Sequence, residues 1–129
     1  MTKAEGNAVV FPGAIVTTLA RLVKPDGSLV KAAAVLLKVF EKNGRVPIAI
    51  DGSATEVVVP TSAVASSLST GDGWRTDAKG HNFSHSFDIE SYLTGGKAYR
   101  MEYRITTVSS GDLFVVANVT VAATGQAAT

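Results

Sequence analysis

YLTGGKAYRMEYRITTVSSGDLFVVANVTV, residues 92–121, is the most strongly patterned stretch of the chain. In its first half apolar and charged side chains alternate, and alternate residues of a strand point to opposite faces of a sheet. The apolar face is formed by Tyr99, Met101, Tyr103 and Ile105. Turn-forming residues follow at 109–112, and a second alternating run covers residues 113–121. The stretch therefore predicts two long antiparallel strands joined by a tight turn.

The sequence of the second strand predicts that its two halves differ in how far they are covered by the rest of the chain. Phe114 and Val116 make its first half apolar on both faces, so we expect that end to be covered on both sides. Asn118 and Thr120 follow on the same face, and we expect them to face water.

The corner before the first strand, LTGGKAYRMEY (residues 93–103), resembles the corner before the sixth strand of immunoglobulin-like and fibronectin type III sandwiches. In that family a Leu precedes a glycine turn, and a Tyr three residues later bonds through its hydroxyl to the backbone upstream. The resemblance implies that Tyr99 is this tyrosine and that Gly95 and Gly96 form the turn. Gly95-Gly96 stands where fibronectin domains usually have Pro-Gly, and the chain has no cysteine pair. The resemblance implies a fold and carries no activity with it.

Length and composition limit the possible functions. A chain of 129 residues is the size of one domain and can bury a core without disulfides or metals. The absence of cysteine excludes disulfides and zinc–thiolate sites. The 12 basic and 11 acidic residues are interspersed, which argues against nucleic-acid binding. The first 16 residues have no signal-peptide pattern and no run is long enough to span a membrane, so we expect synthesis in the cytoplasm without membrane insertion.

The middle of the chain is read as further strands. Residues 15–23 form a predicted strand that ends in the turn signal Lys24–Ser28. Residues 29–41 alternate like a strand but also contain good helix formers, with Asn43-Gly44 as a possible helix end. We interpret this segment as a strand; the helical alternative would make the fold α+β.

Three further segments complete the pattern. Asp51-Gly52 between residues 46–50 and 55–59 predicts a hairpin, and Pro60 places its second strand at an edge. Residues 61–80 are a long Ser- and Gly-rich connection, with a short helix possible at 62–67. Residues 82–89 form a strand with Phe83, His85, Phe87 and Ile89 on one face.

The sequence thus predicts an all-β fold, an immunoglobulin-like sandwich of about seven antiparallel strands. Residues 1–16 would be an N-terminal tail, loose over 1–7, and a possible assembly arm. Residues 17–121 would form the sandwich, and residues 122–129 a flexible C-terminal tail.

No catalytic, metal or cofactor site is predicted. His81 and His85 lie four residues apart, a spacing that on a strand separates them by about 13 Å, too far to share a metal ion. Ser84 and His85 point to opposite faces and cannot readily form a catalytic pair. Asp72, Asp77 and Asp88 lack the oxygen-ligand spacing of a calcium loop.

Two segments are predicted to make contacts with other molecules. Trp74 and Arg75 lie in a glycine-rich loop, where the indole could stack on a sugar, anchor a partner or close one end of the sandwich. The apolar arm contributes Val9, Val10, Phe11 and Ile15, which could form a first strand or pair with a neighbour's sheet edge.

These observations favour a non-enzymatic structural or interaction protein that self-associates or binds a protein lattice. With its small size and lack of cysteine, the chain is similar to phage head-decoration or tail proteins with immunoglobulin-like folds, which implies a place in a virion. The alternative is a surface adhesin or carbohydrate-binding module that binds glycan through the Trp74 loop.

Overall fold

The computed structural model describes residues 15–49, 55–71, 74, 77–88, 96–108 and 111–121, together with the backbone of residues 3–10. Within these ranges the chain forms eight strands and one short 3-10 turn. The elements are β1 (Lys3–Val10), β2 (Ile15–Ala20), β3 (Ala32–Glu41), β4 (Val57–Val59), η1 (Thr61–Ala63), β5 (Val64–Ser69), β6 (His81–Asp88), β7 (Ala98–Thr107) and β8 (Asp112–Val121).

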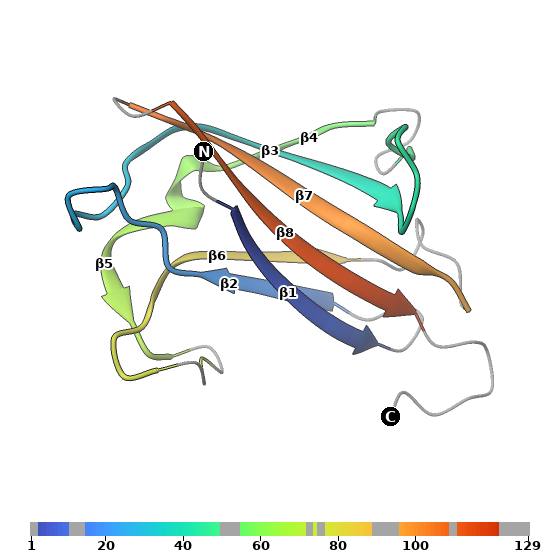
Figure 1. Cartoon of the computed structure of the whole chain (residues 1–129), viewed down its shortest axis with the longest axis horizontal. Helices are drawn as coiled ribbons and strands as arrows, with labels where there is room; N and C mark the ends of the chain where they lie inside the picture. Colours follow the sequence, from blue (N-terminus) through green and yellow to red (C-terminus); the bar gives the residue numbers. More distant parts are fainter. Residues whose placement is uncertain are drawn as a thin grey trace.

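The strands form two sheets that face each other (Figure 1). The larger sheet has the order β1-β8-β7-β3-β4, and the smaller has the order β2-β6-β5. Strands β2 to β8 pair antiparallel, whereas β1 pairs with β8 in parallel. The predicted all-β sandwich of about seven antiparallel strands is therefore confirmed, with β1 as an additional parallel strand.

The β7–β8 hairpin has the register that its alternation predicts. Tyr103 faces Val115 across the ladder, and Ile105 faces Leu113. Thr107 closes the turn by donating from both its amide and its hydroxyl to the Gly111 carbonyl, where Gly111 adopts a φ of +82°. On the outer face of β8, Val116 is buried and Thr120 is exposed, as expected, whereas Phe114 and Asn118 are both half-buried.

The ambiguous segment 29–41 is a strand, which confirms the preferred interpretation. β3 pairs with β7 along nearly its whole length, and Val35, Leu37 and Val39 are almost fully buried. The burial follows the alternation of apolar residues and does not follow helix propensity, because a central position in a sheet covers every second side chain.

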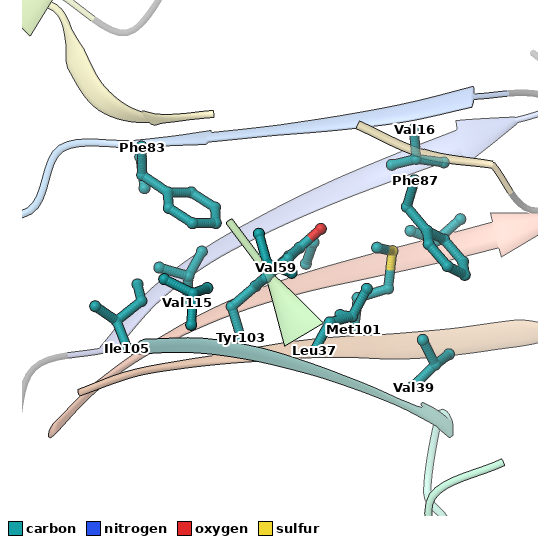
Figure 2. Close-up of a cluster of buried hydrophobic side chains, with 14 of the residues drawn as sticks. Val16, Leu37, Val39, Val59, Phe83, Phe87, Met101, Tyr103, Ile105 and Val115 are labelled. Carbon is teal, nitrogen blue, oxygen red and sulfur yellow. The ribbon is translucent and has the colours of Figure 1, made fainter. Parts of the chain in front are cut away.

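The core lies between the two sheets (Figure 2). Phe83 and Phe87 of β6 project from the smaller sheet toward Tyr103 and Met101 of β7. The Phe83 and Tyr103 rings meet edge to face with centroids 5.0 Å apart. Such packing of two inner faces is what holds a β-sandwich together.

The predicted hairpin between residues 46–50 and 55–59 is wrong. Residues 46–49 form no strand, and Val57–Val59 pairs instead with β3. The Ile48 amide donates to the Val39 carbonyl, so this segment folds back on the end of β3. As predicted from Pro60, β4 is an edge strand.

Two other connections differ from the expectation. The turn Lys24–Ser28 forms, with Gly27 at a φ of +87°, but it does not join a hairpin of paired strands. β2 ends at Ala20, only the bridge Val23↔Leu29 flanks the turn, and the chain crosses to the other sheet. Within the predicted connection 61–80, residues 61–63 form a 3-10 turn and residues 64–69 form β5.

The N-terminus also differs. Residues 1–7 were expected to be loose, yet the backbone of Lys3–Val10 is a strand paired with β8 from Lys3↔Phe114 to Val10↔Val121. Main-chain hydrogen bonding does not require apolar side chains, so the polar start of the arm gave no sequence signal for this pairing. Phe11, Ile89 and residues 122–129 lie outside the described residues.

Candidate functional site

The loop before β6 is organised around the carboxylate of Asp77. One oxygen accepts a hydrogen bond from Arg21 at 2.6 Å. The other accepts from the Trp74 indole at 3.2 Å and from the amides of Lys79 and Gly80. These donors, the Arg21 guanidinium foremost, hold the pKa of Asp77 well below its usual range. The carboxylate therefore remains ionised and fixes the loop to Arg21, the residue that follows β2.

Trp74 is half-buried and its polar edge is already used within the chain. Its ring lies against His81 with centroids 5.5 Å apart and planes tilted by 45°. His81 is itself buried, with one ring nitrogen 3.2 Å from the Gly71 carbonyl. The arrangement packs Trp74 onto the end of β6. Arg75, predicted as its companion at an interaction site, lies outside the described residues.

A second polar side chain, that of Asn82 in β6, links this end of β6 to the buried segment that follows β2. The side chain of Asn82 accepts a hydrogen bond from the Leu22 amide at 2.6 Å and donates to the Leu22 carbonyl at 2.9 Å. Both residues are almost completely buried. The amide side chain thus satisfies the backbone of the segment that follows β2, as a neighbouring strand would.

A third polar group lies between the sheets. His85 Nδ1 is 2.7 Å from the Tyr103 hydroxyl, and the two rings meet at a steep angle. Burial lowers the pKa of His85, and burial raises the pKa of Tyr103 above its usual range, so both groups are neutral near pH 7. The Thr18 hydroxyl faces the same phenol, but among the described residues its oxygen has no partner with hydrogen-bond geometry.

These groups do not assemble a catalytic centre. Nowhere in the described part of the chain do three His, Cys, Asp or Glu residues come together as metal ligands would. His81 bonds to a loop carbonyl and His85 to a core phenol, so the histidine pair is divided between two structural roles. Ser84 and His85 occupy successive positions of β6 and face opposite sides, as the strand period requires.

The predicted family corner is only partly described. Tyr99 is buried at the start of β7, and Gly96 has a φ of +83° and donates its amide to the Val121 carbonyl. Gly95 and the backbone upstream, where the hydroxyl of Tyr99 is expected to bond, lie outside the described residues. Tyr103 is fully buried, as its place on the apolar face predicts.

The arm residues lie at sheet edges. The backbones of Val9 and Val10 belong to β1, an edge of the larger sheet, opposite Thr120 and Val121 of β8. Ile15 begins β2, an edge of the smaller sheet, and its side chain is 65% exposed. The other edges are β4 and β5.

Sequence reasoning missed Arg21, Asn82 and Thr18. Asn82 binds a residue 60 positions earlier, and no local pattern indicates such a partner. Local sequence patterns present Asp77 only as a candidate calcium ligand. Its spacing to Lys79 and Gly80 is the local turn chemistry by which an Asp side chain binds amides two and three residues ahead.

The outer face of the larger sheet carries charged and aromatic side chains that local sequence patterns do not single out. Arg100 stacks on Phe40 at 4.6 Å, forms an ion pair with Glu102, and donates to the carbonyls of Lys42 and Gly44. Beside it, a row of side chains crosses the sheet in register from Val58 through Leu36 and Arg104 to Phe114.

Comparison with known proteins finds no family model that matches the chain and no match among curated proteins. Among solved structures, the chain is similar to a 2,6-sialyltransferase of the Vibrionaceae bacterium Photobacterium sp. JT-ISH-224, crystallised with CMP and lactose. The identity is 7% and the TM-score 0.40, with 95% of this chain and 18% of that chain covered. A likeness at this level carries no argument about the fold or the activity.

The part of the chain that the structure describes contains no helix of the length and hydropathy needed to cross a membrane.

Proposed function

We propose that this protein is a non-enzymatic assembly component that joins a larger particle through its sheet edges, chiefly through the N-terminal strand. The observation that carries the proposal is the parallel pairing of β1 with β8 at the edge of a sandwich whose other strands are all antiparallel. β1 contributes one edge strand and leaves the order of the other seven unchanged. The β8 edge that receives it would equally receive the same strand from a neighbouring copy.

The strand order supports the immunoglobulin-like part of the proposal. In immunoglobulin sandwiches the strands B, E and D share one sheet and C, F and G the other. The orders β2-β6-β5 and β8-β7-β3 have the same arrangement, with β4 added beside β3 as C′ is added in variable-type domains. The first strand of constant-type domains lies in the sheet of B, whereas β1 lies beside β8 in the other sheet.

A virion is the particle that we propose, on the similarity in size and fold to phage decoration and tail proteins. Such proteins need edges or arms that pair with neighbours and need no catalytic group. The described edges fit this requirement because β1 ends the larger sheet and β2 ends the smaller sheet (Figure 1).

The glycan-binding alternative has less support. A sugar-stacking tryptophan presents one ring face to solvent and keeps polar groups free beside it. Trp74 instead packs against His81, and its indole nitrogen donates to Asp77. The loop is thereby held by contacts within the chain.

The test is strand addition in trans. The full chain should form assemblies of more than two copies, measured by light scattering after size exclusion. A chain lacking residues 1–10 should retain its β-sheet circular dichroism, form nothing larger than a dimer, and bind a synthetic peptide of residues 1–14. A scrambled peptide of the same composition should not bind.

Either of two results would contradict the proposal. One is a full chain that remains monomeric at high concentration with no lattice to bind. The other is a truncated chain that still forms the large assembly, which would show that β1 takes no part in it.

A further inference from the structure

We propose that Thr18, Tyr103 and His85 form a pH-responsive joint between the two sheets. In this joint, proton uptake by His85 reverses its hydrogen bond to Tyr103, and the phenol then donates to Thr18. Thr18 is a positioning residue that keeps the phenol bonded in both protonation states. The joint is a property of a single chain, so it stands or falls separately from the proposed assembly function.

The first argument is the geometry of the three groups. Thr18 on β2 lies directly opposite His85 on β6, and cross-strand neighbours of this kind point to the same face of a sheet. The Tyr103 oxygen points from β7 toward the smaller sheet (Figure 2), where it lies 2.7 Å from His85 Nδ1. The Thr18 hydroxyl faces the same oxygen. The phenol therefore has two polar neighbours, one on each of two paired strands.

The second argument is that the Thr18 hydroxyl is buried without a use of its own. Thr18 is 8% exposed, and within the described part of the chain its oxygen has no partner in hydrogen-bond geometry. The other inward positions of β2 carry the apolar residues Val16 and Ala20. A buried hydroxyl without a hydrogen bond is costly, so a hydroxyl at this position needs the phenol as its partner.

The third argument is the count of donors and acceptors. Neutral imidazole has one N–H. With that hydrogen on Nε2, His85 Nδ1 accepts from the phenol of Tyr103, and the phenol oxygen accepts from Thr18. The half-buried imidazole takes up a proton from solvent, after which both ring nitrogens carry hydrogen and Nδ1 donates. The phenol oxygen is then the acceptor, and its own hydrogen turns to the Thr18 oxygen.

No charged group lies beside His85 in the described core. The buried residues there include no Asp, Glu, Lys or Arg. The titratable groups on the same inner faces are His81, four positions earlier on β6, and Tyr99, four positions before Tyr103 on β7. β2, β4, β5 and η1 carry no titratable residue. Burial lowers the pKa of His85, so the contribution of Thr18 is to limit that decrease.

The test measures the pKa of His85 in the full chain by nuclear magnetic resonance. The chain has two histidines, so the variant His85→Gln assigns their signals. Thr18→Val removes the hydroxyl at nearly constant volume and should lower the measured pKa of His85 by about 0.5–1, the equivalent of one hydrogen bond. Thr18→Ser keeps a hydroxyl and should retain the wild-type value.

A matched control lies one residue away. Thr17 is exposed on the outer face of β2, where its hydroxyl bonds to Ser86. Thr17→Val makes the same chemical change on the other face of the strand and should leave the pKa of His85 unchanged. A lower folded-state pKa means a larger loss of stability in acid, because the unfolded chain binds the proton with its ordinary pKa. Between about pH 7 and about pH 5, Thr18→Val should therefore lose more unfolding free energy than Thr17→Val.

The tautomer of His85 provides a measurement that needs no variant of Thr18. Above the pKa of His85, nitrogen chemical shifts of the wild-type chain should show the hydrogen on Nε2, because Nδ1 accepts from Tyr103. A hydrogen on Nδ1 would overturn the proposal, since the hydrogen bond would then have the same direction in both states. An unchanged pKa in Thr18→Val, or an equal decrease in Thr17→Val, would also overturn it.

Discussion

The two sheets of this sandwich satisfy their backbones in different ways. In the larger sheet, β3, β7 and β8 pair along nearly their whole lengths, so the ladder itself provides the hydrogen bonds. In the smaller sheet, the pairing of β5 with β6 is interrupted between Val64↔Phe83 and Ser69↔His81. There, polar side chains provide part of the hydrogen bonding. Asn82 bonds to the backbone of Leu22, and Asp77 accepts from the amides of Lys79 and Gly80 in the loop before β6.

This difference decides where polar side chains can be exchanged without loss of backbone hydrogen bonds. Side chains that are not needed by the backbone can be apolar or can pair among themselves, as on the outer face of the larger sheet. Side chains that replace a missing ladder cannot be exchanged without leaving buried donors and acceptors unpaired. We therefore expect substitutions of fully buried polar residues such as Asn82 to be costly around the smaller sheet, and substitutions on the outer face of the larger sheet to cost less, with Arg100 as the exception.

The largest effect should come from Asn82→Ala. The substitution leaves the buried Leu22 amide without a partner and leaves the Leu22 carbonyl with only the Val30 amide as donor, which should lower the free energy of unfolding by about 2–3 kcal/mol. Asn118→Ala, at a half-buried position of β8 whose backbone lies in the ladder, should cost less than about 1 kcal/mol. Urea unfolding of both variants measures the two losses in unfolding free energy. Equal losses would show that the two sheets do not differ in how they satisfy their backbones.

Arg100→Ala should have the next largest effect on stability. Arg100 is the exception on the larger sheet because its side chain bonds to backbone carbonyls. Its guanidinium holds the loop after β3 through two carbonyls and stacks on Phe40. Its loss should cost about 1–2 kcal/mol, since water can reach the released carbonyls. Lys97→Ala, which removes an exposed ion pair with Glu41, should cost less than about 0.5 kcal/mol. Thermal unfolding measures both losses, and an equal decrease in melting temperature for the two variants would contradict this prediction.

A smaller effect, with a pH signature, is expected at the link between the sheets. Because the pKa of His85 is lower in the folded protein, the unfolded chain binds the proton more readily below about pH 6.5. The free energy of unfolding should therefore decrease as the pH falls through this range, and His85→Gln should flatten that dependence. Tyr103→Phe removes the hydroxyl that bonds to His85 and should cost about 1 kcal/mol at pH 7. An unchanged pH slope in His85→Gln would show that other groups cause it.

The smallest global effect is expected for Asp77→Asn, with a clear local signal. The pKa of Asp77 lies below its ordinary value, so the carboxylate contributes stability above about pH 4, and this contribution disappears as the pH falls through the folded-state pKa. Trp74 is the only tryptophan, and its emission should change in the variant at pH 7 because the indole donates to this carboxylate. Asp26→Asn alters a carboxylate in the turn Lys24–Ser28 and should leave the emission unchanged.

Local sequence patterns were sufficient where the residues that decide a structure are close in the chain. Alternation identified β7, β8, β3 and the inward face of β6, because a strand exposes and buries every second residue. Pro60 correctly indicated an edge strand. The Asp51-Gly52 signal failed, because Val57–Val59 pairs with β3 and not with the segment just before the turn.

The sequence by itself determined an all-β chain, its principal hairpin, most of its core and the absence of thiol chemistry, since these follow from the side-chain period and composition. Only the tertiary structure decided that β1 pairs in parallel with β8, that Asn82 serves the backbone of Leu22, and that Val58, Leu36 and Phe114 form one row. Each of these joins residues that are far apart in the chain. Register and sheet order, which set such contacts, depend on the packing of the whole sandwich and on no local pattern.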